Sequence, residues 1–252
     1  MIKGMNIAVI PARGGSKRIP RKNIRLFAGR PIISWVIDEL MNSGVFTSVY
    51  VSTEDDEIAA ISESAGAKVT FRRSDDLADD FATTGSVMIH AIETIISQLN
   101  EPSLSFCTVY PTAVFADRED YSESFRMYNE LDDGFVFSVG QYDAPIERSF
   151  SLENGVLTRF DDSSRLQRTQ DLPTRYFDAG QFYWSSANMW KKWESGIYQP
   201  SAVHILPKWK VHDIDTQEDW DLAEQIFIAR VMPKLNLWKW NMWHSRQPGV
   251  LE

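Results

Sequence analysis

Five cationic side chains lie within ten residues near the start of the chain, in the segment from 13 to 22. The segment follows a short apolar run and contains the pair Gly14 and Gly15. Glycines let the backbone turn sharply and bring its N–H groups close to a ligand, and the cations add positive charge. This combination predicts a loop that binds the phosphates of a nucleoside triphosphate. The alternative is a basic loop that faces water and binds nothing.

This loop follows neither of the two common nucleotide-binding patterns. A P-loop places Gly-Lys-Ser/Thr directly before a helix, and the chain does not have that spacing here. The pattern G-x-G-x-x-G is also absent after Ile10. Both patterns are therefore excluded at this position.

Two aspartates stand two positions apart far downstream, in the sequence VHDIDT at 211–216. In an extended segment at the end of a strand, Asp213 and Asp215 would point to the same side. Carboxylate oxygens suit Mg²⁺, which commonly takes one or two carboxylates together with phosphates and water. The alternative is that Asp215 only caps the following helix and Asp213 is solvated.

The sequence IPARGGSKRIPRKN at 10–23 resembles the first motif of the bacterial CMP-sialic acid synthetases, the acylneuraminate cytidylyltransferases. Asp213-Ile214-Asp215 resembles the metal-binding motif of the same family, and the resemblance extends over residues 5–229. It implies transfer of CMP from CTP to the anomeric hydroxyl of a nine-carbon 2-keto sugar acid, with Mg²⁺ as cofactor and release of pyrophosphate. It also implies a homodimer.

The resemblance implies roles for individual residues. Lys17, Lys22, Asp213 and Asp215 would be catalytic, and the two aspartates would also bind Mg²⁺. The proton of the sugar hydroxyl would pass to a magnesium-bound water or hydroxide, or to Asp213, and a structural role is favoured for His212. The residues implied to bind CTP are Ala12, Arg13, Gly14, Gly15, Ser16, Lys17, Lys22, Asn23, Arg73 and Thr84.

A third match to the family lies at residues 71–84. The resemblance implies that Arg73 and Thr84, with Asn23 of the first motif, recognise the cytosine and ribose, since amide and guanidinium groups can match the O2, N3 and N4 edge of cytosine. The alternative for Arg73 is a weak ion pair on the surface with Asp76 or Asp79.

The residues around the implied sugar site differ from the N-acetylneuraminate pattern. The sequence YPTA at 110–113 stands where those enzymes have QPTS, and DAGQFYW at 178–184 looks like the pseudaminic acid cytidylyltransferases. That branch uses a sugar with fewer hydroxyls and more apolar surface, against which aromatic rings pack well. The residues implied to bind the sugar are Tyr110, Thr112, Arg168, Gln170, Asp178, Gln181 and Tyr183.

Two choices at the sugar site stay open. A guanidinium can hold the sugar carboxylate in a fork, and Arg168 is the first candidate. Four further arginines compete for that role: Arg148, Arg159, Arg165 and Arg175. Phe182 and Trp184 either contact the sugar or alternate into the core.

The elements that must position these residues alternate along the first 140 residues. Apolar runs predict strands and helical periodicity predicts helices, as in a Rossmann-like doubly wound, mostly parallel α/β sheet. The resemblance implies that this sheet is of the nucleotide-diphospho-sugar transferase type. The predicted strands are 5–10, 48–52, 67–71, 104–110 and 135–139. The predicted helices are 32–41, 54–65 (capped by Thr53), 84–99 and 117–131.

The pattern changes between residues 144 and 175. The pair Asn154-Gly155 within the alternating run 150–160 predicts a β-hairpin in an inserted arm. Such an arm covers a ligand, contacts a second subunit or is a surface ornament, and the resemblance favours dimerization. Strands at 176–185 and 204–206 and helices at 187–194 and 216–232 follow. Residues 1–235 are thus predicted to form one nucleotidyltransferase domain, followed by a tryptophan-rich tail at 236–252 without an assigned function.

Composition narrows the class of protein. The 252 residues carry a net charge of −9, which argues against nonspecific binding to nucleic acid or to an anionic membrane. Cys107 is the single cysteine, so there is no disulfide framework. No apolar run is long enough for a membrane helix and no signal peptide is recognisable, so we expect a cytoplasmic protein.

Two alternatives to a pseudaminate enzyme remain. Within the class, the acceptor could be N-acetylneuraminate, legionaminate or 3-deoxy-manno-octulosonate. Outside it, the chain could be a catalytically silent nucleotide-binding protein. Intact Lys17, Lys22, Asp213 and Asp215 argue against the silent protein.

Overall fold

A computed structural model describes residues 5–78, 82–101, 104–192 and 201–235. Its centre is a six-stranded sheet with the strand order β10-β6-β9-β5-β1-β4. All of these strands run in the same direction except β9, which pairs antiparallel with both β5 and β6. The strands are β1 (Asn6–Pro11), β4 (Ser48–Ser52), β5 (Ser105–Val109), β6 (Phe135–Gln141), β9 (Tyr176–Ser186) and β10 (Ser201–Ile205).

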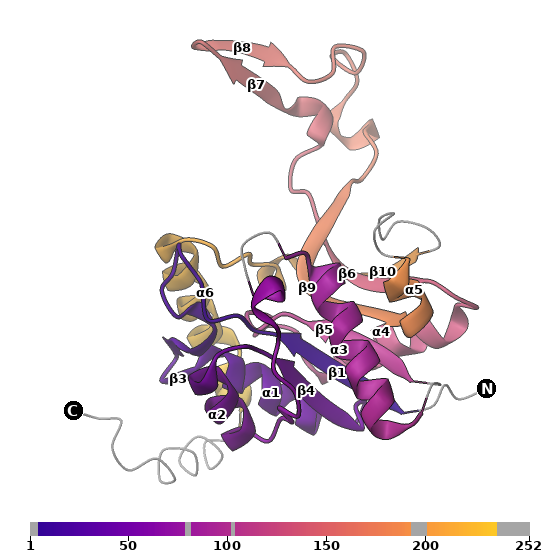
Figure 1. The fold of residues 1–252 in the computed structure, drawn as a ribbon. Helices are drawn as coiled ribbons and strands as arrows, with labels where there is room; N and C mark the ends of the chain where they lie inside the picture. The colour runs from indigo at the N-terminus through magenta and orange to yellow at the C-terminus, as the bar shows by residue number, and fades with distance from the viewer. Residues whose placement is uncertain (1–4, 79–81, 102–103, 193–200, 236–252) are drawn as a thin grey trace.

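Helices cover both faces of this sheet (Figure 1). They are α1 (Ile32–Asn42), α2 (Asp56–Ser64), α3 (Thr84–Leu99), α4 (Arg118–Glu130), α5 (Ala187–Lys191) and α6 (Gln217–Arg230). Successive residues of β1 enter opposite cores, because Ile7 packs in the cluster with α3 and α5 whereas Ala8 packs in the cluster with α1, α4 and α6. The predicted doubly wound, mostly parallel sheet is confirmed.

Short elements complete the body. The two-residue strands β2 (Leu26–Phe27) and β3 (Arg30–Pro31) pair antiparallel. In the described part of the body, short 3₁₀ turns are η1 (Lys22–Ile24), η2 (Asp75–Leu77), η6 (Lys208–Lys210) and η7 (Met232–Lys234). None of the described helices combines the length and the apolar character needed to cross a membrane.

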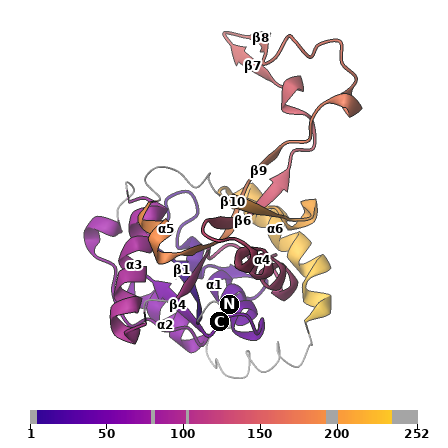
Figure 2. The ribbon, with the colours of Figure 1, turned by 90° about the vertical axis from the view of Figure 1, so that its right-hand side faces the viewer.

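The arm between β6 and β9 projects away from the body in both views (Figures 1 and 2). It carries the hairpin β7 (Phe150–Glu153) and β8 (Val156–Arg159), with turns η3 (Ile146–Arg148) and η4 (Thr169–Asp171). Asn154 and Gly155 have φ angles of 51° and 80°, which a tight two-residue hairpin turn requires. The predicted hairpin is confirmed.

Two local predictions are wrong. Residues 67–71 form no strand, because only Lys68 bonds to β4 before the chain turns toward Arg73, whose N–H donates to the Thr53 carbonyl. Thr53 does not cap α2. Asp55 does, and it accepts the Ile58 N–H at 2.9 Å.

The later elements follow the predictions with shifted ends. The strand predicted at 204–206 begins at Ser201, and the helix predicted at 216–232 spans Gln217–Arg230. The helix predicted at 187–194 spans Ala187–Lys191, and residues 193 and 194 lie outside the described residues. The predicted tail at 236–252 lies outside the described residues.

Candidate active site

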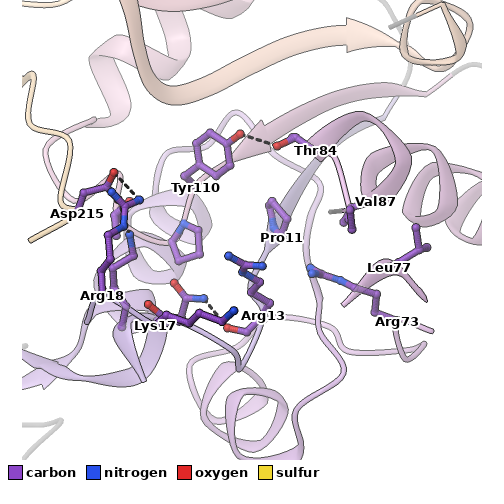
Figure 3. Close-up of a pocket in the computed structure, with 16 residues that line it drawn as sticks. Pro11, Arg13, Lys17, Arg18, Arg73, Leu77, Thr84, Val87, Tyr110 and Asp215 are labelled. Atoms are coloured by element: carbon purple, nitrogen blue, oxygen red, sulfur yellow. Dashed lines mark hydrogen bonds and ion pairs between the residues drawn. The ribbon is translucent and has the colours of Figure 1, made fainter. Parts of the chain in front are cut away.

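A pocket of about 510 Å³ opens at the carboxyl ends of β1 and β5, beside the N-terminus of α3 (Figure 3). The connections from β1 lead first to β4 on one side and later to β5 on the other, so the pocket lies where the strand order reverses. Ligands of open α/β sheets bind at such a switch point. The lining consists of Pro11, Arg13, Ser16, Lys17, Arg18, Lys22, Asn23, Arg73, Leu77, Ala82, Thr84, Val87, Tyr110, Pro111, Thr112 and Asp215.

The basic loop is fastened to the N-terminus of α2 by acidic residues. The Gly14 N–H donates to Glu54 Oε1 at 2.6 Å, and a Cβ at Gly14 would lie 2.6 Å from Asp55 Oδ2. Arg21 donates to both oxygens of Asp55, at 2.5 and 3.0 Å, and to Glu57 at 2.5 Å. A larger residue at position 14 would therefore displace Asp55, which caps α2 and pairs with Arg21.

Three residues of the predicted CTP set do not line the pocket. The Gly14 N–H is occupied by Glu54, Gly15 has no atom within 4 Å of a Cβ position, and Ala12 is buried in the core. The remaining seven members do line it. Among them, Asn23 holds the loop closed, since its Nδ2 donates to the Arg13 carbonyl at 2.9 Å.

Asp215 lies next to cations of the loop. Lys22 Nζ is 3.3 Å from Asp215 Oδ1 and donates to the Ile214 carbonyl at 2.7 Å, and Arg18 lies 2.7 Å from Asp215 Oδ2. Asp213 does not line the pocket and is exposed. Desolvation by its surroundings and, secondly, the charge of Asp215 raise the pKa of Asp213 above its usual value.

The prediction that the aspartate segment lies at the end of a strand is wrong. The segment follows the turn η6, and β10 ends earlier, at Ile205. The two aspartates still flank a side chain that is turned inward, because Ile214 is only 1% exposed. Thr216 caps α6 and accepts the Asp219 N–H, so the alternative in which Asp215 serves as the cap is wrong.

Arg73 is buried at the pocket wall. It is 6% exposed, its Nη2 donates to the Ser52 carbonyl at 2.6 Å, and its Nη1 lies 4.0 Å from Glu54. The alternative of a surface ion pair for Arg73 is wrong. On the opposite wall, Thr84 Oγ1 and the Tyr110 hydroxyl lie 2.8 Å apart. Burial raises the pKa of Tyr110, so its hydroxyl keeps its proton.

The structure brings part of the predicted sugar set together. Tyr110 and Thr112 line the pocket, and the Tyr110 ring meets the edge of Tyr183 with centroids 5.9 Å apart. The Tyr183 hydroxyl donates to Asp178, 2.9 Å from each carboxylate oxygen. Gln181 is 2% exposed, and its Nε2 donates to the Lys210 carbonyl at 2.5 Å.

Phe182 and Trp184 do not contact a ligand site. Both are fully buried in the core cluster, where Trp184 stacks on Phe46 with centroids 5.1 Å apart. The core alternative for these two residues is confirmed. The aromatic wall of the pocket therefore consists of Tyr110, backed by Tyr183.

Arg168 and Gln170 lie on the arm and do not line the pocket of their own chain. Arg168 forms a fork with Asp171 at 2.7 and 3.1 Å. Three competing arginines have partners within the arm: Arg148 bonds to the carbonyls of residues 165 and 167, Arg159 pairs with Asp162, and Arg175 pairs with Glu147. Among the described residues, none bonds to or pairs with the Arg165 guanidinium.

Sequence reasoning counted Arg18 among the cations of the loop but not among the residues that bind CTP. Arg18 lines the pocket and pairs with Asp215. Sequence reasoning missed Lys210 entirely. Lys210 is buried against two carboxylates just before the aspartate segment, although a lysine usually signals a surface position. A single sequence gave no indication of that burial.

Comparisons with known proteins give consistent results. Residues 7–230 match the family model described as cytidylyltransferase. The chain is 39% identical over 224 residues to the pseudaminic acid cytidylyltransferase of Campylobacter jejuni subsp. jejuni serotype O:2, covering 88% of this chain and 96% of that protein. It is 32% identical over 223 residues to the N-acylneuraminate cytidylyltransferase B of Danio rerio, covering 86% and 50%.

A solved structure shares the fold. The CMP:2-keto-3-deoxy-manno-octonic acid synthetase complexed with CTP superposes with a TM-score of 0.66 at 13% identity, covering 90% of this chain and 100% of that chain. At this identity the likeness concerns the fold alone.

Proposed function

The chain belongs to the cytidylyltransferase family, and from that premise we propose that it transfers CMP from CTP to the anomeric hydroxyl of a nonulosonic acid, pseudaminic acid. The hydroxyl oxygen attacks the α-phosphorus, the bond from that phosphorus to the bridging oxygen breaks, and pyrophosphate leaves. The proton of the hydroxyl passes to a base of the site. The products are CMP-pseudaminic acid and pyrophosphate.

One observation supports this proposal most strongly. The pocket joins a cationic loop near residue 20 with Asp215, which lies 193 residues beyond Lys22. Arg13, Lys17 and Lys22 can neutralise the charge that develops on the phosphates, and such fixed electrostatic groups supply most of the catalysis in phosphoryl transfer. Asp213, whose pKa is raised, is suited to accept the proton of the sugar hydroxyl.

The donor set fits the Mg²⁺ that this reaction implies. Asp215 lines the pocket and Asp213 stands on the other side of the buried Ile214, and no group of three or more possible ligands gathers among the described residues. A cation that takes two carboxylates and otherwise phosphates and water matches this sparse set. When bound there, Mg²⁺ would neutralise the triphosphate and polarise its oxygens.

Pseudaminic acid is proposed as the acceptor from two observations. The relative with 39% identity bears that name. At the pocket, Tyr110 presents a ring whose neighbour Tyr183 is fixed by Asp178, which suits a sugar with methyl groups and few hydroxyls. N-acylneuraminate and 3-deoxy-manno-octulosonate stay as alternatives, because relatives of this fold act on them, and legionaminate stays as a chemically similar acid.

The arm is proposed to join two copies of the chain. Its side chains include Leu152, Leu157 and Leu166, which are 67%, 63% and 89% exposed. Exposed apolar clusters of this kind mark protein interfaces, and an isolated two-stranded hairpin is marginal in water. In the homodimer, Arg168 or Arg165, whose guanidinium has no partner among the described residues, would reach the sugar carboxylate in the pocket of the other copy. The use of CTP supports a cytoplasmic location.

Pyrophosphate release tests this function. The purified chain is mixed with CTP, Mg²⁺ and, separately, pseudaminate, legionaminate, N-acetylneuraminate or 3-deoxy-manno-octulosonate. Release with pseudaminate at the highest kcat/KM supports the proposal, and preference for another acid changes only the acceptor. Binding of CTP without release for any acid would favour the silent nucleotide-binding protein.

A further inference from the structure

A cluster of charged side chains lies outside the pocket lining, and its Lys210 and Asp120 side chains are buried, whereas that of Asp117 is 40% exposed. Lys210 is 6% exposed, and its Nζ lies 2.5 Å from Asp117 Oδ2 and 2.6 Å from Asp120 Oδ2. Asp120 also lies 3.0 Å from His204 Nε2. The cluster joins the N-terminus of α4, the strand β10 and the turn η6.

Asp120 is the centre of this cluster. One of its oxygens accepts from Lys210 and from the Asp117 N–H at 3.0 Å, and the other faces His204. Burial alone would raise the pKa of Asp120, but the hydrogen bonds from His204 and Lys210 bring it down to about 2. Its carboxylate is thus ionised at neutral pH and balances the lysine. Burying such an ion pair costs desolvation free energy, and apolar side chains of similar volume would stabilise the fold equally well. Stability alone therefore does not account for the charged cluster.

The chain that follows Lys210 carries the two aspartates of the site. Asp213 is three residues further on, and the Lys210 carbonyl accepts from Gln181 Nε2 at 2.5 Å. At the other end of the segment, Lys22 donates to the Ile214 carbonyl at 2.7 Å. Residues 210–215 are therefore fixed at both ends, and the charged cluster supplies the first anchor.

We propose that Lys210, held by Asp117 and Asp120, is a positioning residue that fixes Asp213 and Asp215 for the Mg²⁺ of the CTP complex. The inference rests on the proposed function. Lys210 does not line the pocket. It acts through the backbone of residues 210–215, as partners behind metal ligands do when they orient them.

The test compares three variants with one matched control. Lys210→Met removes the anchor, and Lys210→Arg keeps a cation with altered geometry. Asp117→Asn weakens the anchor but keeps the cap of α4, because asparagine caps helices as well as aspartate. The control is Asp38→Asn, which removes the partner of another buried cation, Arg30, 2.7 Å away and outside this pocket.

The main readout is binding of Mn²⁺ to the protein with CTP and no acceptor, followed by electron paramagnetic resonance. We expect Lys210→Met to weaken Mn²⁺ binding about tenfold or more and to lower kcat to a similar degree, with KM for CTP changed less than about threefold. Asp117→Asn should show a smaller loss, and Lys210→Arg should restore part of it. Asp38→Asn should lower Tm without changing Mn²⁺ binding.

Unchanged Mn²⁺ binding and kcat in folded Lys210→Met would overturn the inference. If that variant does not fold, unchanged Mn²⁺ binding in Asp117→Asn, or an equal loss in Asp38→Asn, would overturn it instead. The wild-type chain shows whether the proposed function fails independently of the anchor. If it binds Mn²⁺ and CTP but transfers CMP to no acid, the proposed function fails while the variants still test the anchor.

Discussion

Lys22 Nζ lies 3.3 Å from Asp215 Oδ1, although 193 residues separate them in the sequence. The loop after β1 and the segment before α6 therefore share one site. In this arrangement the carboxylate is neutralised by Lys22 and by Arg18. In the proposed reaction, a triphosphate with Mg²⁺ would bring the phosphates for the cations and the metal for the carboxylate, so both sides of the pair would gain a partner.

Asp215→Ala should lower turnover by about a hundredfold or more, while CTP binding largely persists, because the carboxylate acts on the metal and the cations hold the phosphates. Turnover and the Kd for CTP, measured by calorimetry, check this. Asp221→Asn is the control, since Asp221 lies in the helix α6 that follows Asp215, outside the pocket lining, and its carboxylate accepts from Gln217. Unchanged Mg²⁺-dependent activity in Asp215→Ala would exclude Asp215 as a ligand.

Gly14→Ala should displace the basic loop, because the new Cβ would lie 2.6 Å from Asp55 Oδ2 and 3.2 Å from its Cβ. We expect a loss of about 1–3 kcal/mol in the free energy of unfolding and a higher KM for CTP. Gly15→Ala is the matched control for stability, since a Cβ there meets nothing within 4 Å. Equal Tm values for the two variants would contradict the close contact between Gly14 and Asp55.

The Asp55–Arg21 pair should make the free energy of unfolding depend on pH in the acidic range. The hydrogen bonds from Arg21 lower the pKa of Asp55 to about 2 in the folded chain, against about 3.9 in an unfolded one. A lowered folded pKa stabilises the fold above the unfolded value, and this contribution disappears as the pH falls through about 2. The difference in unfolding free energy between wild type and Asp55→Asn should therefore shrink from pH 4 to pH 2.

Two features make that comparison specific. Asparagine can keep the cap of α2, so the variant removes mainly the ion pair. Asp56→Asn is the control, because Asp56 is 93% exposed and pairs with Arg72 at the surface. Chemical denaturation at each pH gives the values. A constant difference between wild type and Asp55→Asn over this range would contradict the assignment.

Replacing Leu152 and Leu157 together by threonine should convert a dimer to monomers. The two leucines are a cross-strand pair on one exposed face of the hairpin, and threonine keeps the strand propensity while removing apolar surface. Light scattering after size exclusion measures the mass. Ser151→Ala, which alters the neighbouring cross-strand pair with Thr158, should leave the dimer intact. A monomeric wild type, or a dimer that survives the double change, would contradict the role of the arm.

The sequence predicted the sheet well where local pattern decides structure. The strand Ser48–Ser52 has its predicted ends, and the Asn154-Gly155 turn forms the predicted hairpin. Strand direction was less accessible, because a buried antiparallel strand such as Tyr176–Ser186 has the same side-chain alternation as a parallel one. Residues 67–71 were predicted as a strand and form only one isolated bridge, because apolar composition alone does not provide a partner strand.

The site was predictable to the extent that its chemistry lies in short motifs. Lys22 and Asp215 were recognised from separate motifs, and the fold brings them together. Lys210 was not recognised, because its burial depends on Asp117 and Asp120 from a helix about 90 residues earlier. Phe182 and Trp184 had two readings, and only the core packing of the sheet decides between them.

The most direct test of CMP transfer follows the phosphorus of CTP. The chain is incubated with Mg²⁺, pseudaminate and CTP labelled at either the α- or the γ-phosphorus, and the products are separated by chromatography. We expect the α label in a sugar nucleotide and the γ label in pyrophosphate. The γ label on the sugar, or no transfer of either label by a chain that binds CTP, would contradict the proposed reaction.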